Sequence, residues 1–358
     1  MRRVPSLLSF FALSLSFVPP VRAQFLQTEY QQRRAALLAR MPDGVLLVLG
    51  SREPVEDYLS FYQNPSFNYL TGFLEPDAAL VVVKSGAATA STTFVEPRDP
   101  SREVWTGTRL GVDGVRERLG IQGRNTGELG QVLDSLAAQG LPFFVVGDFP
   151  SGDLGTEDAT LTVDQQLLSA LRRRHPTLIV KVVNSLVEQL RGKKSNSELA
   201  MIRKAVDITV MAQRAAMQAV APGMNEFEIQ ALIEYTFRRN GADRPSFASI
   251  VGSGPNATTL HYNADNRVIG HNDIVVMDVG ASYKGYAADV TRSVPASGVY
   301  SLEQRAIYRI VRDAQAAAER QAKLGAAAHL MSDSAAAVLA TGLARLGLIE
   351  SFQGNDRS

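Results

Sequence analysis

The length and composition of the chain set the first limits on what it can be. Its 358 residues exceed what one hydrophobic core usually serves, so we expect two domains. With 45% hydrophobic residues, 20% charged residues and a formal net charge of +1, the chain lacks the composition of a nucleic-acid-binding or polyanion-binding protein. Cysteine is absent, which excludes disulfides and thiolate metal sites, and the four histidines form no H-x-x-x-H pair. Any metal site must therefore use carboxylate and imidazole ligands.

The first 23 residues have the pattern of a secretory signal peptide. Arginines at positions 2 and 3 precede an apolar run over 7–18, and residues 21–23 form a small-x-small cleavage sequence. The apolar run is shorter than the ~20 residues that a membrane helix requires. We therefore predict cleavage after Ala23 and a secreted or periplasmic protein that has no membrane contact once the signal is removed.

The segment over 24–184 is predicted to form an α/β domain. Short apolar stretches typical of strands alternate there with helical stretches. The predicted strands are 45–49, 79–83, 93–95, 143–146 and 178–183, and the predicted helices are 29–40, 127–139 and 164–174.

A second domain over 185–358 is predicted from a change in the sequence pattern. A polar bend at 190–195 leads to Ser195 and Glu198, which form a capping box for a long helix that ends before Pro222. Asn225 then caps a helix over Glu226–Arg239. Helical spacing predicts the side chains that face the core: Leu199, Ile202, Val206, Val210 and Ala215 on the first helix, and Phe227, Ala231, Ile233 and Phe237 on the second.

Two aspartates, Asp278 and Asp289, stand within apolar sequence that is typical of strands. Aspartate is disfavoured in strand interiors, and an unpaired buried carboxylate costs several kcal/mol, so each of the two needs a partner. Residues 281–285 are a plausible hairpin tip, and the midpoint of the pair falls between Tyr283 and Lys284. A hairpin folded there predicts that the two aspartates are cross-strand neighbours on one face, with Cβ atoms roughly 4.5 to 5.5 Å apart. Such a pair repels unless one carboxyl takes a proton or divalent cations lie between the two.

Spacing alone leaves a second interpretation of these aspartates open. One of them could be a turn residue while the other pairs with Arg292 or Lys284, as many strand-end carboxylates do. A bulge at Gly280 or Gly285 would also turn the two side chains to opposite faces of the hairpin.

The histidines carry little information by themselves. His261 precedes a tyrosine in a Gly/Asn-rich loop, where a lone histidine is more often a surface or locally hydrogen-bonded residue. His271 lies in a predicted turn and His329 on an alanine-rich helix, and both are interpreted as structural.

The block Val275–Val294, which reads VVMDVGASYKGYAADVTRSV, resembles the first metal-ligand hairpin of the pita-bread metallopeptidases, the family of aminopeptidase P, prolidase and methionine aminopeptidase. The segment Glu198–Ala205 is similar to the E-x-x-x-I-R-K-A pattern of these enzymes. Residues 67–77 (FNYLTGFLEPD) and 103–107 (EVWTG) are similar to the N-terminal domain of the aminopeptidase P branch. The resemblance covers almost the whole mature chain. It implies an α/β (α+β) protein in which a creatinase-like N-terminal domain precedes a pita-bread catalytic domain.

The same resemblance implies an activity and a site. Asp278 and Asp289 would be metal ligands, with Asp289 bridging two divalent ions that are most often Mn²⁺ in this family. His261 would line the substrate site and help to handle the scissile amide. The implied enzyme is a metal-dependent aminopeptidase that releases the first residue from peptides with proline in second position, through a water that two metal ions activate. Its expected partners are such peptides and no nucleic acid, and homo-oligomers are common in the family.

The sequence departs from the family pattern near its end. Family members continue with an H-G-x-G-H segment and two further metal-binding glutamates, whereas this sequence ends at Ser358 and Glu350 matches neither glutamate motif. Three of the five ligands that the resemblance implies are therefore missing, and we expect a C-terminally truncated chain that is inactive alone.

Two other functions remain open at this stage. The chain could be a non-catalytic pita-bread peptide-binding or scaffold protein, and the sequence of the locus beyond residue 358 would discriminate between this function and the peptidase. A third interpretation is creatinase, which shares the fold and needs no metal, but the presence of both Asp278 and Asp289 weighs against it.

Overall fold

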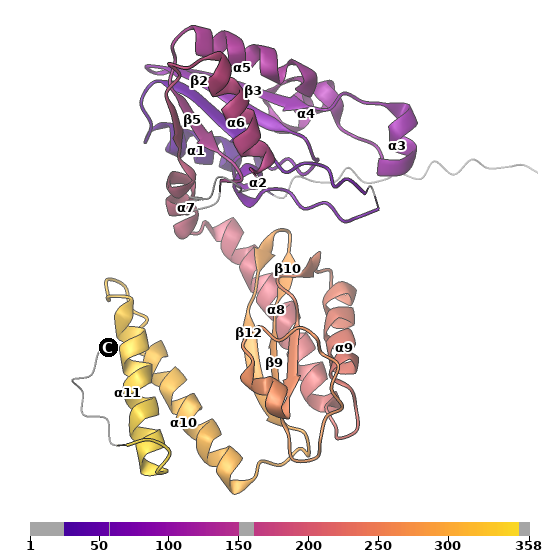
Figure 1. Cartoon of the computed structure of the whole chain (residues 1–358), viewed down its shortest axis with the longest axis vertical. Coiled ribbons are helices and arrows are strands. Elements are labelled where there is room, and N and C mark those ends of the chain that lie inside the picture. The colour runs from indigo at the N-terminus through magenta and orange to yellow at the C-terminus, as the bar shows by residue number, and fades with distance from the viewer. Residues whose placement is uncertain (1–24, 57, 150–160, 351–358) are drawn as a thin grey trace, which may run out of the picture. The chain divides into compact units, whose positions relative to one another are not determined.

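The computed structural model describes residues 25–56, 58–149 and 161–350, which divide into two compact units between Lys194 and Ser195 (Figure 1). The predicted signal peptide lies outside the described residues. Within the described part of the chain, no helix is both long and apolar enough to cross a membrane.

The first unit is built on a six-stranded sheet with the strand order β4-β3-β2-β1-β5-β6. Its strands are β1 (Gly44–Leu49), β2 (Ala79–Ser85), β3 (Ala88–Val95), β4 (Gln122–Asn125), β5 (Phe143–Val146) and β6 (Val180–Val182). The central strand β1 runs antiparallel to β2 and parallel to β5. All six residues of β1 are buried, which requires that helices cover both faces of the sheet.

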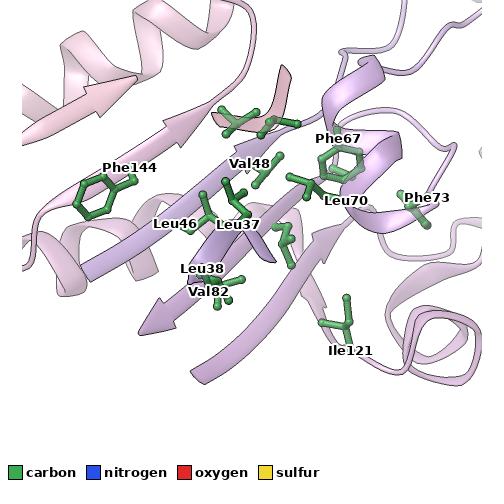
Figure 2. Close-up of a cluster of buried hydrophobic side chains, with 14 of the residues drawn as sticks. Leu37, Leu38, Leu46, Val48, Phe67, Leu70, Phe73, Val82, Ile121 and Phe144 are labelled. Carbon is green, nitrogen blue, oxygen red and sulfur yellow. The ribbon is translucent and has the colours of Figure 1, made fainter. Parts of the chain in front are cut away.

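Two hydrophobic cores lie on the two faces of this sheet. The helices are α1 (Gln27–Leu38), α2 (Pro65–Thr71), α3 (Pro100–Thr106), α4 (Gly111–Leu119), α5 (Leu129–Ala138), α6 (Val163–Arg174) and α7 (Asn184–Gly192), with a short 3₁₀ turn η1 (Thr126–Glu128). Leu46 and Val48 belong to the core with α1, α2, α4 and α7, which Figure 2 shows, whereas Val45 and Leu47 belong to the core with α5 and α6. This alternation is the period-two pattern of a strand that is covered on both sides.

The last helix of the first unit sets the end of that unit. Val187 of α7 is fully buried in the same core as β1, so the unit extends past residue 184, where the sequence analysis placed the boundary, to Lys194.

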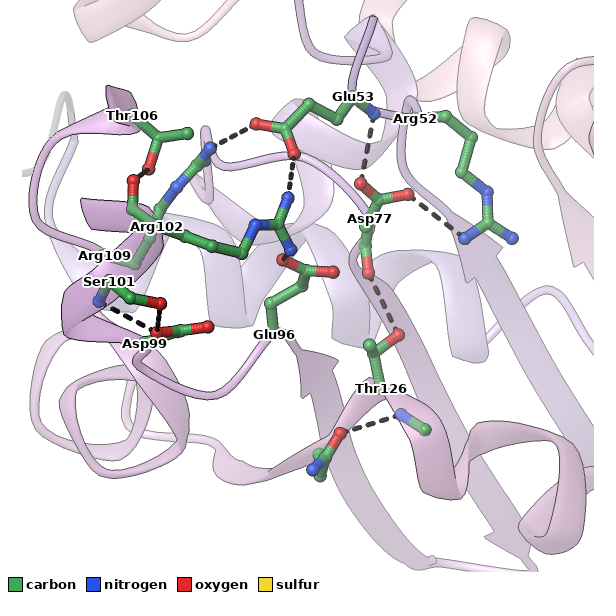
Figure 3. Close-up of polar contacts among 12 residues, drawn as sticks. Arg52, Glu53, Asp77, Glu96, Asp99, Ser101, Arg102, Thr106, Arg109 and Thr126 are labelled. Carbon is green, nitrogen blue, oxygen red and sulfur yellow. Dashed lines mark hydrogen bonds and ion pairs between the residues drawn. The ribbon is translucent and has the colours of Figure 1, made fainter. Parts of the chain in front are cut away.

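The short helix α3 is attached to the first unit by charges. None of its residues is buried. Arg102 of α3 forms ion pairs with Glu53 at 2.9 Å and Glu96 at 3.1 Å, and Arg109, which follows the helix, pairs with Glu53 at 2.6 Å (Figure 3). The Glu53 carboxylate thus pairs with two guanidinium groups, one from α3 and one from the segment that follows it.

We expect the substitution Glu53→Gln to loosen α3, because it removes two ion pairs from a helix that has no apolar anchor. Trp105, the only tryptophan of the chain, is 81% exposed on this helix and reports on it directly. Its fluorescence anisotropy should fall, and trypsin should cut after Arg102 about fivefold faster, as expected for ~1 kcal/mol of lost local stability. The control is Glu128→Gln, which removes an ion pair with Arg124 elsewhere on the same unit. Equal anisotropy and equal cleavage rates in parent and Glu53→Gln would contradict this account of α3.

The second unit combines two small sheets with two pairs of helices. Its strands are β7 (Arg244–Pro245), β8 (Ile250–Ser253), β9 (Ile274–Val279), β10 (Ala281–Tyr283), β11 (Tyr286–Ala287) and β12 (Val290–Pro295), in the orders β11-β10-β7 and β12-β9-β8. Its helices are α8 (Asn196–Ala219), α9 (Glu226–Arg239), α10 (Leu302–Glu319) and α11 (His329–Arg345), with a 3₁₀ turn η2 (Gly254–Thr258). One core joins α8 and α9 to the strands β8, β9, β10 and β12.

The predicted inward face of α8 was wrong. Leu199 and Val206 are exposed, and the residues that α8 buries are Glu198, Ala205, Ile208, Thr209, Ala212, Gln213 and Ala216. The small alanines allow the helix to approach the strands closely, and the side chains of Thr209 and Gln213 bond to strand backbone, so the largest apolar residues do not mark the packed face. On α9, Phe227 and Ala231 are also exposed, whereas Ile233 and Phe237 are buried as predicted.

Candidate metal centre

The hairpin that contains both aspartates is broken into two parts. Its tip is formed by β10 and β11 around a two-residue turn, Lys284 and Gly285, and its arms continue as β9 and β12. Both turn residues have positive φ, 51° and 77°, which is the geometry of a two-residue type I′ hairpin loop. Asp278 lies in β9, and Asp289 lies in the break between β11 and β12.

The register of the hairpin places the aspartates diagonally. Asp278 is directly opposite Thr291. The prediction that Asp289 would be its direct cross-strand neighbour was wrong, because the turn is centred between Lys284 and Gly285, one residue later than the predicted midpoint. The pairing keeps the same register on both sides of the break, so no bulge intervenes, and Asp289 remains on the same face as Asp278 at the diagonal position.

The two carboxyl groups contact each other despite this offset. Burial, the charge of Asp278 and a hydrogen bond with Asp278 together raise the pKa of Asp289. The hydroxyl of Thr291 donates to Asp278 Oδ1 at 2.8 Å, whereas the guanidinium of Arg292 donates to the backbone carbonyl of Thr291. Asp278 is half-buried and Asp289 is exposed, so the pair is held at the surface of the hairpin and not in the apolar interior. Two carboxylates in contact need either a shared proton or a cation between them.

A glycine and a serine permit the close approach of the strands at the break. A Cβ added to Gly280 would lie 1.8 Å from the carbonyl oxygen of Ala288, so only glycine fits opposite Asp289. The backbone N–H of Ser246 donates to the carbonyl of Gly280 at 2.8 Å, and the hydroxyl of Ser246 donates to the carbonyl of Ala288 at 2.8 Å. Ser246 therefore ties the two sides of the break together immediately before Asp289.

Helix α8 supports the aspartates from the opposite face. The buried side-chain amide of Gln213 donates to the carbonyl of Met277 at 2.9 Å and to the carbonyl of Val290 at 2.7 Å, which are the neighbours of Asp278 and Asp289 in sequence. One turn earlier, the hydroxyl of Thr209 accepts from the N–H of Ala281 at 2.9 Å. Neither residue was predicted from the sequence, where the available signal was two polar side chains four positions apart within an alanine-rich stripe.

Asp289 of the aspartate pair lines a groove between β12 and α10. The groove has a volume of about 1150 Å³. Asp289, Thr291 and Arg292 line its strand side, and Tyr300, Gln304, Ile307 and Tyr308 are among the residues on its other side. A space of this size, with apolar and polar side chains and a carboxylate at its edge, can accept a short peptide segment.

His261 is on a different segment from this pair. It is exposed in a turn that follows η2. Among residues 25–56, 58–149 and 161–350, no third histidine, aspartate or glutamate joins Asp278 and Asp289 in a group that could hold a metal ion. The structure thus brings the two predicted carboxylate ligands together and leaves His261 outside their cluster.

The paired carboxylates fit a divalent metal. Their oxygens are hard donors, their mutual repulsion favours a cation between them, and the chain has no cysteine that would select a softer ion. Asp278 and Asp289 are the residues that would hold it.

Known protein families match both units. Residues 200–354 match metallopeptidase family M24. Residues 30–141 match the family of the aminopeptidase P N-terminal domain. The Xaa-Pro aminopeptidase of Escherichia coli (strain K12) is 34% identical over 330 residues, which are 90% of this chain and 74% of that protein. The Xaa-Pro aminopeptidase of Haemophilus influenzae is 30% identical and matches 92% of this chain and 74% of its own length.

Solved structures agree with these relatives. The structure of Pseudomonas aeruginosa aminopeptidase PepP superposes with a TM-score of 0.82 at 30% identity. The matched region is 92% of this chain and 75% of the PepP chain. The structure of a zinc-substituted Escherichia coli aminopeptidase P in complex with product superposes with a TM-score of 0.81 at 31% identity. The matched region is 92% of this chain and 76% of the Escherichia coli chain.

These similarities confirm the predicted fold class, a mixed α/β chain in which an aminopeptidase P-type N-terminal domain precedes a catalytic domain of the M24 type. They also confirm that the chain is a metallopeptidase-type hydrolase, whose family implies divalent metal ions. The chain therefore belongs to metallopeptidase family M24, on its aminopeptidase P branch.

Proposed function

We propose that this protein is an Xaa-Pro aminopeptidase, which releases the N-terminal residue from peptides with proline in second position. The relatives at 30% to 34% identity are named for this activity. The observation that carries the proposal is the contact between Asp278 and Asp289 at the edge of a groove of about 1150 Å³, within the hairpin that resembles the metal-ligand hairpin of the family.

Each proposed site residue has a separate task. Asp278 and Asp289 are the residues that would hold divalent ions, for which we propose Mn²⁺. When bound, such ions activate a water molecule and polarise the scissile carbonyl. Thr291 keeps Asp278 oriented through its hydroxyl, at 2.8 Å. His261 binds near the scissile amide, and the groove between β12 and α10 receives the peptide.

The activity is tested with the product of the gene, read to its stop codon. Incubation of Arg-Pro-Pro with this protein and Mn²⁺ should release arginine, whereas Arg-Ala-Ala should stay intact. EDTA should abolish the release and added Mn²⁺ should restore it. Failure to release arginine with Mn²⁺, Zn²⁺ or Co²⁺ would contradict the proposed activity, and binding of Arg-Pro-Pro without cleavage would favour a peptide-binding protein instead.

We also propose that the protein is exported through residues 1–23, on the basis of their charge and apolar pattern. A mature N-terminus at Gln24 in the periplasmic or extracellular fraction is the expected result, and an uncleaved protein in the cytoplasm would contradict it.

A further inference from the structure

Glu226 is a fully buried carboxylate to which several neutral groups donate. It stands at the first position of α9 and is 0% exposed. The backbone N–H and the hydroxyl of Ser253 donate to its Oε1 at 2.6 and 2.7 Å, and the hydroxyl of Tyr262 and the N–H of Arg267 donate to its Oε2 at 2.7 and 2.9 Å. The amide of Asn256 lies 3.2 Å from Oε1 and 3.3 Å from Oε2. Every one of these donors belongs to the segment 253–267.

These contacts keep Glu226 ionised in the interior. Burial alone would raise the pKa of Glu226, but the hydrogen bonds from Ser253, Arg267 and Tyr262 together bring that pKa below its ordinary value. A buried charge is tolerated when hydrogen bonds occupy its oxygens in this way. The segment 253–267 is therefore folded around one anion.

Tyr262 is the member of this network next to His261. Its hydroxyl donates to Glu226 and also accepts from the amide of Asn256 at 2.8 Å and from the N–H of Asn266 at 3.3 Å. These three contacts meet at the hydroxyl and restrain the end of the Tyr262 ring, and through the ring they restrain the backbone next to His261. The imidazole of His261, next to Tyr262 in the chain, is exposed, so packing against the protein does not fix its position.

A second buried carboxylate attaches the same segment to strand β8. Asp265 is 1% exposed and accepts from the N–H of Val251, in β8, at 3.0 Å. The apolar side chains of Ile229, Ile233 and Phe237 already attach α9 to the core of the unit. The contacts of Glu226 are thus directed to the segment that holds His261, and the helix has its own separate anchors.

We propose that Glu226 is a positioning residue, whose buried carboxylate holds His261 in place for catalysis through the hydroxyl of Tyr262. This inference rests on the proposed function, which assigns His261 to the substrate site. Glu226 itself does not contact the substrate, and its effect passes through the segment 253–267.

The variant that isolates this link is Tyr262→Phe in the full-length gene product. It removes one hydroxyl while Ser253, Asn256 and Arg267 still donate to Glu226, so the buried charge keeps most of its partners. We expect kcat for Arg-Pro-Pro to fall about tenfold with KM changed less than about twofold, because the imidazole remains present but is less well placed. Glu226→Gln, which turns an amide toward several donors, should change kcat in the same direction and by more.

Two readouts do not depend on turnover. The ring signals of His261 in a ¹H–¹³C spectrum, assigned by their loss in His261→Gln, should shift and broaden in Tyr262→Phe. Amide hydrogen exchange should accelerate in 253–267 and stay unchanged in α8. The control is Ile233→Val on the same helix, which costs about 1 kcal/mol of core packing without touching the segment.

The outcomes separate the two proposals. Unchanged His261 signals, exchange and kcat in Tyr262→Phe would overturn the role of Glu226, and so would the same changes in Ile233→Val, since a general loss of stability would then explain them. If the parent protein cleaves no Arg-Pro-Pro, the proposed function fails. The His261 signals and the exchange in 253–267 then decide by themselves whether Glu226 holds the histidine.

Discussion

Replacing Asp289 by asparagine in the full-length gene product is expected to abolish hydrolysis of Arg-Pro-Pro while the protein stays folded. The amide is nearly the same size as the carboxyl but carries no charge, so one of the two carboxylates that would hold divalent ions is lost. We expect kcat/KM to fall by at least about 10³-fold, which corresponds to ~4 kcal/mol of transition-state stabilisation. Binding of Mn²⁺, measured by titration calorimetry, should weaken in parallel.

The stability of the metal-free variant gives an independent check on Asp289. The pKa of Asp289 is raised in the folded chain by burial and by Asp278, so the ionised form destabilises the folded state above the pKa of the unfolded residue, and this penalty is absent below it. Without metal, Asp289→Asn should therefore melt at the same or a slightly higher temperature than the parent at about pH 7, with no difference near pH 3. Asp333→Asn, on the exposed surface of α11, is the charge-matched control and should keep full activity. If Asp289→Asn turned over substrate as fast as this control, the metal assignment would be untenable.

The substitution Gly280→Ala is expected to disrupt the same site through the backbone. The new Cβ would lie 1.8 Å from the carbonyl oxygen of Ala288 and 2.5 Å from the hydroxyl of Ser246, and no rotamer change relieves a clash with a backbone atom. The hairpin must therefore separate at the break beside Asp289, with loss of the hydrogen bonds that Ser246 makes there. We expect about 3 kcal/mol of destabilisation in urea unfolding followed by circular dichroism, together with weaker Mn²⁺ binding.

A second glycine provides the comparison for this variant. Gly130, on α5 of the other unit, has open space around its Cβ position and an ordinary φ, so Gly130→Ala should leave stability unchanged or raise it by up to ~1 kcal/mol. An unfolding midpoint of Gly280→Ala equal to that of the parent would show that the strands at the break are not as close as the structure has them.

Much of the architecture could be predicted from local sequence patterns. The helix over Glu226–Arg239 has the predicted bounds because Asn225 and Glu228 form a capping box at its start. The central strand β1 was predicted from its apolar run, since only a strand covered on both faces is apolar at every position. The aspartate pair itself could be identified, because charged residues in apolar strand sequence require a partner.

The register of that pair could not be obtained in the same way. The sequence between the aspartates allows turns centred at neighbouring positions, and a shift of one residue changes which side chains are opposed. The positive φ of Lys284 and Gly285 selects one of them, and the close approach at Gly280 keeps the register constant across the break.

The residues that support the aspartates and His261 could also not be predicted from the sequence, because only tertiary packing shows their contacts. Gln213 and Thr209 are polar residues on a helix whose larger apolar side chains suggested a different inward face, and only their bonds to strand carbonyls and amides show why they are buried. Nothing in the sequence around Glu226 indicates that a segment 27 to 41 residues later in the chain surrounds its carboxylate. The sequence by itself therefore determined the family, the α/β class and the pairing of two aspartates, because these depend on residue type and local pattern. The tertiary structure decided the register of the two aspartates and which residues support them, because these depend on contacts between residues that are distant in the chain.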